Sequence, residues 1–110
     1  MRISNTLARK YLLSLGYNEV WLKPHTKFHD TVYTFTGENY KALDLFNLWD
    51  GIALHDTGVF FIQIKTNAWP KEQPIVDWCN KYKARGLAIN VKADKLNKDE
   101  YKCHMRVYEY

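Results

Sequence analysis

Four polar residues in the middle of the chain have the types and spacing that metal-assisted chemistry on phosphate esters uses. Asp44 and Asp50 flank the segment LFNLW, and Gln63 and Lys65 alternate with apolar residues in the run FFIQIKTN. Carboxylate and amide oxygens are ligands that hard divalent cations accept. A lysine ammonium beside them can stabilise the negative charge that develops in a transition state.

The run that contains Gln63 and Lys65 has the alternation of a strand with two different faces. Its apolar residues at 60, 62 and 64 point to the core, so Gln63 and Lys65 share the opposite face. A lysine on such an apolar strand is costly unless it has a partner. Hairpin pairing across residues 55–58 would bring Asp50 toward it. The alternative is that Lys65 is the exposed end of an edge strand and that Asp50 only caps a turn.

The elements that must position these residues follow from hydrophobic periodicity and turn residues. Helical spacing predicts two helices, with Ser4 as an N-cap and Gly16 and Gly86 as stops, over 5–15 and from about Pro74 to Gly86. Strand-like runs are found at 31–36, 48–54, 59–66, 87–91 and 103–107, with a turn at 37–39. The order helix, strands, helix, strand, strand predicts an α/β fold with a mixed sheet flanked by helices.

Composition places residues 1–110 in one globular domain. Of 110 residues 46% are hydrophobic and 15% aromatic, which excludes intrinsic disorder, and Gly and Pro are too few for a collagen-like chain. The apolar runs are too short to span a membrane, and the N-terminus has no secretory apolar region. Cys79 and Cys103 lack zinc-site spacing, so a reduced, cytoplasmic setting is expected.

The charge is distributed unevenly along the chain. The net charge is +4, yet residues 41–70 hold more acidic than basic side chains, whereas both flanks are basic. A surface that binds phosphates should be basic, and a site for a divalent cation should be locally acidic. The same net charge is also ordinary for a soluble domain.

The joint pattern resembles the PD-(D/E)xK nuclease superfamily. Asp50, twelve intervening residues and then hydrophobic-Gln63-hydrophobic-Lys65 look like small Holliday-junction-resolvase-like and phage-type members, which carry an Asp-Leu-Phe-Gly-x-x-Asp element ahead of such a strand. The resemblance spans roughly residues 5–91 and implies a restriction-endonuclease-like core. Two departures are visible: the family usually has an acid at Gln63, and its first helix often supplies a Glu, whereas the nearest acid here is Glu19.

The resemblance implies roles for individual residues. Asp50, the amide oxygen of Gln63 and the backbone carbonyl of Ile64 would hold Mg²⁺ or Mn²⁺, and Lys65 would sit at the attacking water and the scissile phosphate. Asp44 could be a second acidic ligand or the partner of Lys41.

Further residues are candidates for contacts with nucleic acid. They are polar, basic or aromatic residues that follow the motif or lie along the second helix: Asn67, Trp69, Lys81, Lys83 and Arg85. A solvated helix face explains the three basic residues equally well. Trp21, Trp49 and Trp78 are core candidates, His25 and His29 are surface candidates, and His104 and Arg106 lie on the polar face of a strand.

These observations predict a metal-dependent nuclease that cuts DNA, with branched or junction DNA as a possible substrate and RNA as an alternative one. The small size favours either structure-selective cutting or reliance on a dimer or a partner, and a homodimer would let two sites address two strands. The alternative is a nuclease-like domain that binds nucleic acid or a protein without cutting, which Gln63 and the acid-free first helix favour. An unrelated α/β protein with a chance motif is the third interpretation.

Overall fold

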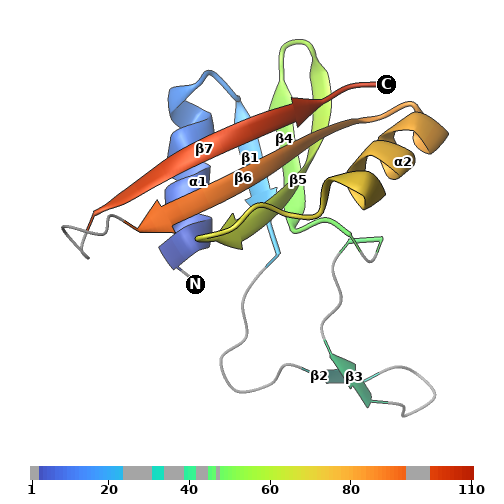
Figure 1. Ribbon diagram of the computed structural model, residues 1–110, viewed down its shortest axis with the longest axis horizontal. Coiled ribbons are helices and arrows are strands. Elements are labelled where there is room, and N and C mark those ends of the chain that lie inside the picture. The colour runs from blue at the N-terminus through green and yellow to red at the C-terminus, as the bar shows by residue number, and fades with distance from the viewer. Residues whose placement is uncertain (1–2, 24–30, 34–38, 42–44, 47, 94–99) are drawn as a thin grey trace.

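The computed structural model describes residues 3–23, 31–33, 39–41, 45–46, 48–93 and 100–110. Its elements are, in chain order, α1 (Ile3–Ser14), β1 (Glu19–Leu22), β2 (Thr31–Tyr33), β3 (Asn39–Lys41), β4 (Gly51–His55), β5 (Gly58–Thr66), α2 (Glu72–Tyr82), β6 (Arg85–Ala93) and β7 (Tyr101–Tyr108). Figure 1 shows one five-stranded sheet, β1-β4-β5-β6-β7, with β2 and β3 paired separately. The predicted α/β fold with a mixed sheet flanked by helices is confirmed.

The central strands of the sheet differ in direction. β1, β4 and β5 pair antiparallel in succession, and β7 pairs antiparallel with β6. β5 and β6 are parallel, and α2 lies in the connection between them. A parallel pair needs such a crossover because the chain must return to the starting edge.

The two helices cover opposite faces of the sheet, so β5 and β6 bury side chains on both sides. Ala8 and Leu12 of α1 pack in one core cluster with the residues that β5 and β6 turn toward α1, among them Ile62 and Ile89. Ile75 and Cys79 of α2 pack in a second cluster on the other face. This double burial explains the almost continuous apolar runs in β5 and β6.

Two local expectations were wrong. Ser4 lies inside α1 and is buried, where its hydroxyl bonds the Thr66 hydroxyl at 2.6 Å, so it does not cap the helix from outside. α2 ends at Tyr82 with Lys83 in the left-handed conformation, and Gly86 belongs to β6. Gly86 is needed there because an added Cβ would lie 2.6 Å from the Trp49 ring.

Two further expectations need correction. The strand expected at 48–54 begins only at Gly51, and pairing of His55 with Gly58 leaves a turn of just two residues between β4 and β5. Trp21, expected in the core, is 53% exposed, because it alternates with the buried Val20 and Leu22 on the four-residue edge strand β1.

Several sequence expectations lie outside the described residues. Asp44, His25, His29 and positions 34–38 belong to this group. Among the helices that the structure describes, none is long and apolar enough to cross a membrane.

Candidate active site

The β4–β5 hairpin brings Asp50 next to Gln63. Gly51 pairs with Ile62, and the Asp50 N–H donates to the Ile62 carbonyl at 2.7 Å, so Asp50 is one register position from Gly51 and lies opposite Gln63. This juxtaposition is the one that the hairpin pattern predicts. It arises because the tight turn at the far end fixes the register of both strands.

The carboxylate of Asp50 is held in place by its neighbours. Its Oδ2 accepts a hydrogen bond from the Ile64 N–H at 2.7 Å, and its Oδ1 lies 3.8 Å from the Lys23 Nζ. The Lys23 N–H also donates to the Asp50 carbonyl at 2.8 Å, which continues the β1–β4 ladder by one residue. The Asp50 side chain is 19% exposed, so the carboxylate is oriented and still reachable.

Gln63 contributes an amide oxygen to the site. This Oε1 atom is buried and accepts no hydrogen bond within the described part of the chain. Such an orphaned oxygen costs about 1–3 kcal/mol unless something else satisfies it. Because alternate strand residues share a face, Lys65 lies on the same face as Gln63, and its side chain is exposed.

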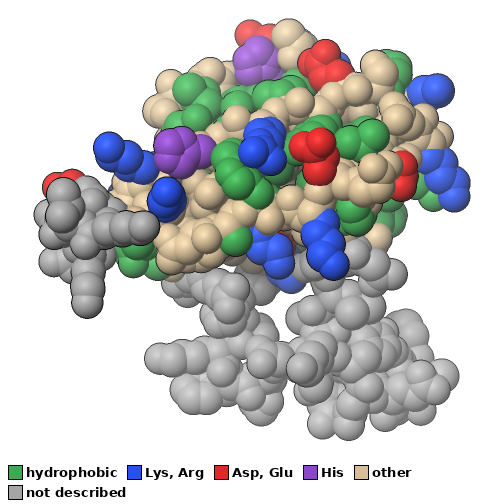
Figure 2. Space-filling view, in the orientation of Figure 1, with side chains coloured by type: hydrophobic (Ala, Val, Ile, Leu, Met, Phe, Trp, Pro, Cys, Tyr) green, Lys and Arg blue, Asp and Glu red, His purple; other side chains and the backbone are tan. Residues whose placement is uncertain are grey.

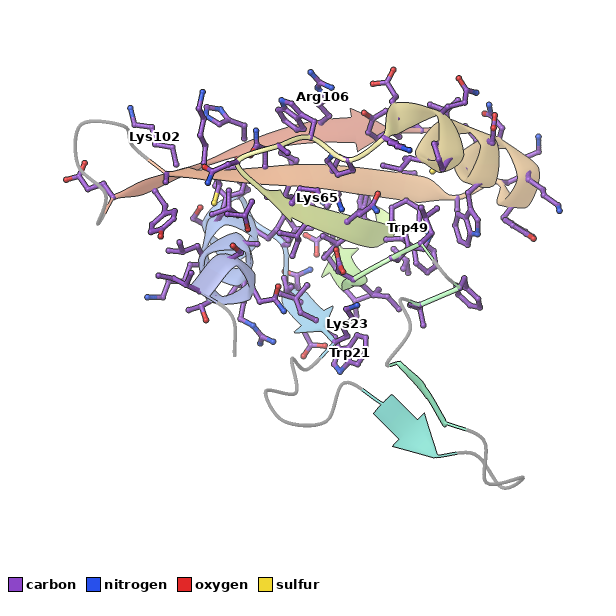
Figure 3. All side chains as sticks on the ribbon, turned by 60° about the horizontal axis from the view of Figure 1, so that its bottom comes forward. Trp21, Lys23, Trp49, Lys65, Lys102 and Arg106 are labelled. Atoms are coloured by element: carbon purple, nitrogen blue, oxygen red, sulfur yellow. The ribbon has the colours of Figure 1, made fainter. Side chains whose placement is uncertain are left out.

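Trp49 anchors the segment that precedes Asp50. Its side chain is fully buried in the cluster on the α2 face, next to Phe61 and Trp78. Its backbone is tied to Leu45 by two hydrogen bonds of 2.7 and 2.9 Å. Asp50 therefore follows directly from a residue that the core immobilises, which limits the positions its carboxylate can take (Figure 3).

The donor set fits Mg²⁺ or Mn²⁺ with incomplete protein coordination. Asp50 supplies an oriented carboxylate, and Gln63 supplies the orphaned oxygen. The Ile64 carbonyl points to the same side of β5 as the Ile64 N–H, which is the side of Asp50. No group of three or more His, Cys, Asp or Glu side chains that could hold a metal occurs among the described residues. Few protein ligands can suffice for Mg²⁺, because the ion keeps several water ligands and is also coordinated by substrate phosphates.

The structure places Glu19 away from the site. Glu19 pairs with Leu54 on β1, whereas Asp50 is opposite Lys23, four residues farther along that strand. At about 3.3 Å per residue this is roughly 13 Å of strand. Glu19 thus does not replace the acid that the first helix supplies in the resembled family.

The residues expected to contact nucleic acid fall into two groups. Asn67 and Trp69 are close to Lys65 in the chain, but both have internal contacts: the Asn67 side-chain oxygen accepts from the Ala93 N–H at 2.8 Å, and the Arg106 guanidinium lies 4.1 Å from the Trp69 ring centre. These contacts fix the ends of the strands beside the site. They do not test whether Asn67 and Trp69 contact nucleic acid, which stays a prediction.

The second group lies at the other end of β5. Arg85 pairs with Phe60 in register, and its guanidinium stacks on the Phe60 ring and bonds the Thr57 carbonyl. Lys81 and Lys83 flank the end of α2, which precedes Arg85. Lys65 is five residues along β5 from Phe60, about 16 Å of strand. The structure therefore does not bring Lys81, Lys83 and Arg85 together with Asp50, Gln63 and Lys65.

Sequence reasoning missed Lys23. It reaches the site through the pairing of β1 with β4, a contact between segments 27 residues apart in the chain. The only available signal was the alternation in the short run Glu19–Leu22, which is too brief to predict a partner strand or a register.

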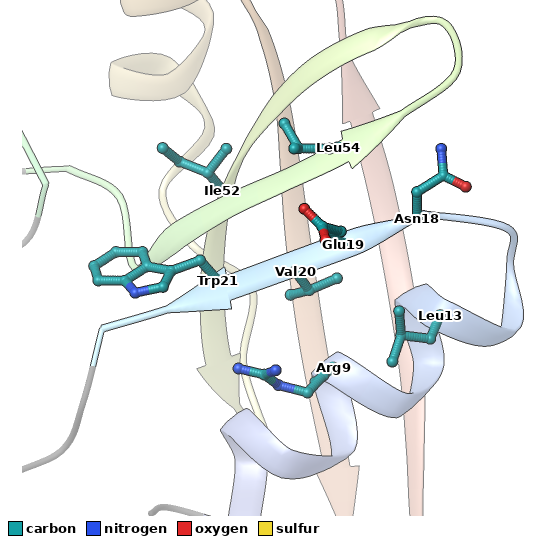
Figure 4. Close-up of a pocket in the computed structure, with 8 residues that line it drawn as sticks. All are labelled: Arg9, Leu13, Asn18, Glu19, Val20, Trp21, Ile52 and Leu54. Atoms are coloured by element: carbon teal, nitrogen blue, oxygen red, sulfur yellow. The ribbon is translucent and has the colours of Figure 1, made fainter.

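A cavity of about 590 Å³ runs along the edge strand β1, apart from these residues. Figure 4 shows Trp21, Ile52 and Leu54 near one side of β1 and Arg9 and Leu13 of α1 near the other. Its lining includes none of the three motif residues, and its acid and base, Glu19 and Arg9, do not form a catalytic set of known type. The site at the hairpin base remains the better candidate.

The two thiols are poorly suited to nucleophilic chemistry. Burial raises the pKa of both Cys79 and Cys103 above the ordinary value of 9.0. A thiol attacks as the thiolate, and a raised pKa keeps it protonated at neutral pH. Cys79 instead fills the cluster beneath α2.

Comparison with known protein families, curated proteins and solved structures finds no match to this chain. The chemistry of the site therefore has to be argued from its own residues. Asp50 and Gln63 offer oxygen ligands of the kind that a divalent cation accepts, and Lys23 and Lys65 place ammonium groups at the same end of the β1-β4-β5 sheet.

Proposed function

We propose that this protein is a metal-dependent nuclease that hydrolyses phosphodiester bonds in DNA. The observation that carries the proposal is the convergence of Asp50, Gln63 and Lys65 at one end of the β4–β5 hairpin, with the Gln63 oxygen buried and unpartnered within the described residues. The resemblance to the PD-(D/E)xK nucleases supports it, because these are the positions that carry the family motif.

In this proposal some residues bind the metal ion, and Lys65 stabilises the negative charge on the phosphate. A bound Mg²⁺ or Mn²⁺ would supply Lewis-acid activation of a water and of the phosphate. Asp50, Gln63 and the Ile64 carbonyl would hold that ion, and the Ile64 N–H orients the carboxylate. Lys65 would stabilise the charge that develops on the phosphate as the water oxygen bonds to phosphorus and the bond to the leaving oxygen breaks.

The substrate is proposed to be recognised by shape more than by sequence. Within the residues that the structure describes, both helices and the five-stranded sheet form the unit that carries the candidate site, and only the two-stranded sheet β2-β3 lies outside it. Branched or junction DNA fits this constraint, and a homodimer would place two sites on two strands.

The test is cleavage of a labelled substrate panel by the wild type and by Lys65→Ala. The panel holds single-stranded, duplex, flap and four-way-junction DNA and RNA, each with Mg²⁺, Mn²⁺ or EDTA. Removing the Lys65 charge is expected to slow cutting roughly 10²–10³-fold, as for other groups that stabilise transition-state charge. Lys10→Ala is the matched control, because Lys10 is an exposed lysine on α1, which covers the opposite face of the sheet. Metal-independent cutting, or equal rates for Lys65→Ala and wild type, would contradict the proposal.

A nuclease-like domain that binds nucleic acid without cutting is the second candidate. It is favoured by the single carboxylate at the described site and by the Lys23 ammonium 3.8 Å from it, which competes with a cation for Asp50. Such a protein would bind DNA in EDTA, cut no substrate of the panel and show no rise in Tm when Mn²⁺ is added. A metal site would raise the Tm because the ion binds only the folded state.

A further inference from the structure

A row of basic side chains lies beside the candidate site, on the strands β5, β6 and β7. Lys65 pairs with Asn90, and Asn90 with His104, so all three lie on one face of the sheet. Two further register pairs continue the same face, Lys92 with Lys102 and Ala88 with Arg106. We call the five cationic or titratable members of this row the basic face: Lys65, Lys92, Lys102, His104 and Arg106.

The basic face is exposed and extends beyond the part of the sheet that α2 covers. All five of its side chains are exposed, and Figure 2 shows Lys, Arg and His side chains spread over β6 and β7 on this side of the molecule. Figure 3 labels Lys65 on β5 and Lys102 and Arg106 on β7. Glu72 at the start of α2 lies 3.9 Å from Arg106 and marks the acidic limit of the face.

The pairing of Lys92 with Lys102 is unfavourable in the absence of an anion. The two lysines are direct cross-strand partners, and like charges in that position repel each other. Neither ammonium forms an ion pair within the described ranges. Both are at the end of the sheet toward which β5 runs with Lys65. An anionic partner lying across this end would relieve the repulsion.

Arg106 is held in place for contact with a partner. Its guanidinium lies 4.1 Å from the centre of the Trp69 ring, and its side chain remains 49% exposed. Along β7, residues 102, 104 and 106 project at intervals of two residues, about 7 Å. This interval is close to the separation of successive phosphates along an extended nucleic-acid strand.

We propose that the basic face is a track for the phosphate backbone of a nucleic-acid strand, which Lys92, Lys102, His104 and Arg106 lead to Lys65. The inference rests on the proposed function in taking nucleic acid as the partner and extends it to the path of the bound strand, which follows the charges along β7 and reaches Lys65 on β5 past Lys92 on β6. It also moves the main phosphate contacts from the end of α2, where sequence reasoning expected them, to the sheet.

The test measures binding in EDTA, where cutting does not interfere. Fluorescence anisotropy of labelled single-stranded and duplex DNA is recorded over a series of salt concentrations for the wild type, for Lys92→Ala/Lys102→Ala and for Lys81→Ala/Lys83→Ala. Both double variants remove two exposed lysines, and the second tests the lysines at the end of α2 that sequence reasoning named as candidates. The first should fold normally, since it removes a repulsive pair; its Tm confirms this.

The Lys92→Ala/Lys102→Ala variant is expected to bind about tenfold more weakly at low salt, which corresponds to the loss of two exposed ion pairs. The slope of log K against log salt should fall by about 1.4 for single-stranded DNA and about 1.8 for duplex DNA, because two phosphate contacts are lost. An unchanged slope, or a larger change in Lys81→Ala/Lys83→Ala, overturns the proposal. Vesicles with anionic lipid serve as a further probe of the wild type. If the protein binds these vesicles and does not bind DNA, the proposal of a nucleic-acid track is also overturned.

The same variant separates this inference from the proposed function. In the cleavage assay with Mg²⁺ it should raise the KM and leave the kcat near that of the wild type. Should the wild type cut nothing, the EDTA titration still decides whether the basic face binds nucleic acid. If the wild type cuts DNA and the Lys92→Ala/Lys102→Ala variant binds DNA as tightly as the wild type does, the proposed function stands and the track is refuted.

Discussion

At the scale of single residues, Gln63 is the most informative position in the molecule. Its alternation with apolar neighbours places it on the face of Lys65, and its amide oxygen is buried with no partner among the described residues. A glutamine in a purely structural role would be expected to satisfy that oxygen, because an unmade buried hydrogen bond is costly. The neutral amide adds no carboxylate to that of Asp50, and no group of three or more His, Cys, Asp or Glu that could hold a metal occurs among the described residues.

We predict that Gln63→Glu strengthens metal binding. The substitution keeps the size of the side chain and adds a negative charge opposite Asp50, so Mn²⁺ affinity should rise roughly tenfold or more. In EDTA the two carboxylates repel each other and the Tm should fall, whereas Mn²⁺ should raise the Tm by more than in the wild type. Thermal unfolding with and without Mn²⁺ and calorimetric titration measure both effects.

Gln63→Met is the matched control for this prediction. It removes the amide oxygen at similar volume, so the variant should be at least as stable as the wild type in EDTA and lose the Mn²⁺-dependent rise in Tm. Equal Mn²⁺ affinity in the wild type, Gln63→Glu and Gln63→Met would show that Gln63 does not contact the ion.

At the scale of elements, α2 and β6 determine where Asp50 stands. Trp49 fills the cluster beneath α2 and is fully buried against the backbone of Gly86. The close approach leaves no room for a Cβ at residue 86, because it would lie 2.6 Å from the Trp49 Cη2 atom. The contact between Gly86 and Trp49 therefore helps to fix the position of Asp50, because Trp49 directly precedes Asp50 in the chain.

We predict that Gly86→Ala destabilises the fold by about 1–3 kcal/mol, the usual cost of overpacking. Trp49→Phe removes the ring atoms that the new methyl group would meet, and it also removes the Trp49 Nε1 group, which has no hydrogen-bond partner in the described structure. The double variant should lose less stability than the sum of the two single losses, with a coupling of about 0.5 kcal/mol or more. Urea unfolding of the four proteins gives the coupling; strict additivity would mean that the contact is not the cause.

At the scale of the whole molecule, one sheet face is divided between apolar and basic halves. The basic face occupies β5, β6 and β7 beyond the start of α2. The β1–β4–β5 half carries large exposed apolar side chains, including Trp21, Leu54 and Val59. Monomeric proteins rarely leave a contiguous apolar patch exposed, and a second copy of the chain would cover it while pairing two sites.

We predict that light scattering gives the mass of two chains at working concentration. Val59→Lys should shift the mass toward one chain, because it places a charge in the apolar half of that face. Leu15→Lys is the control: Leu15 is similarly exposed but follows α1, and its substitution should leave the mass unchanged. A one-chain mass for the wild type would refute the dimer.

The sequence by itself determined the α/β class, the order of the elements and the pairing of Asp50 with the end of β5. These follow from local periodicity and from a hairpin with a short turn, both of which are properties of neighbouring residues. The prediction that the second helix ends at Gly86 was wrong, because this glycine allows close packing against Trp49. Such a contact cannot be predicted from the neighbouring residues.

Tertiary structure alone decided the rest of the site. Lys23 meets Asp50 because β1 pairs with β4, and Arg106 meets Trp69 because β7 joins the sheet beside β6. Lys65 shares a face with Lys92 and Lys102 because β5 pairs in parallel with β6 across the α2 crossover. Register between distant strands depends on the burial of whole faces, so a linear pattern could not place these charges together.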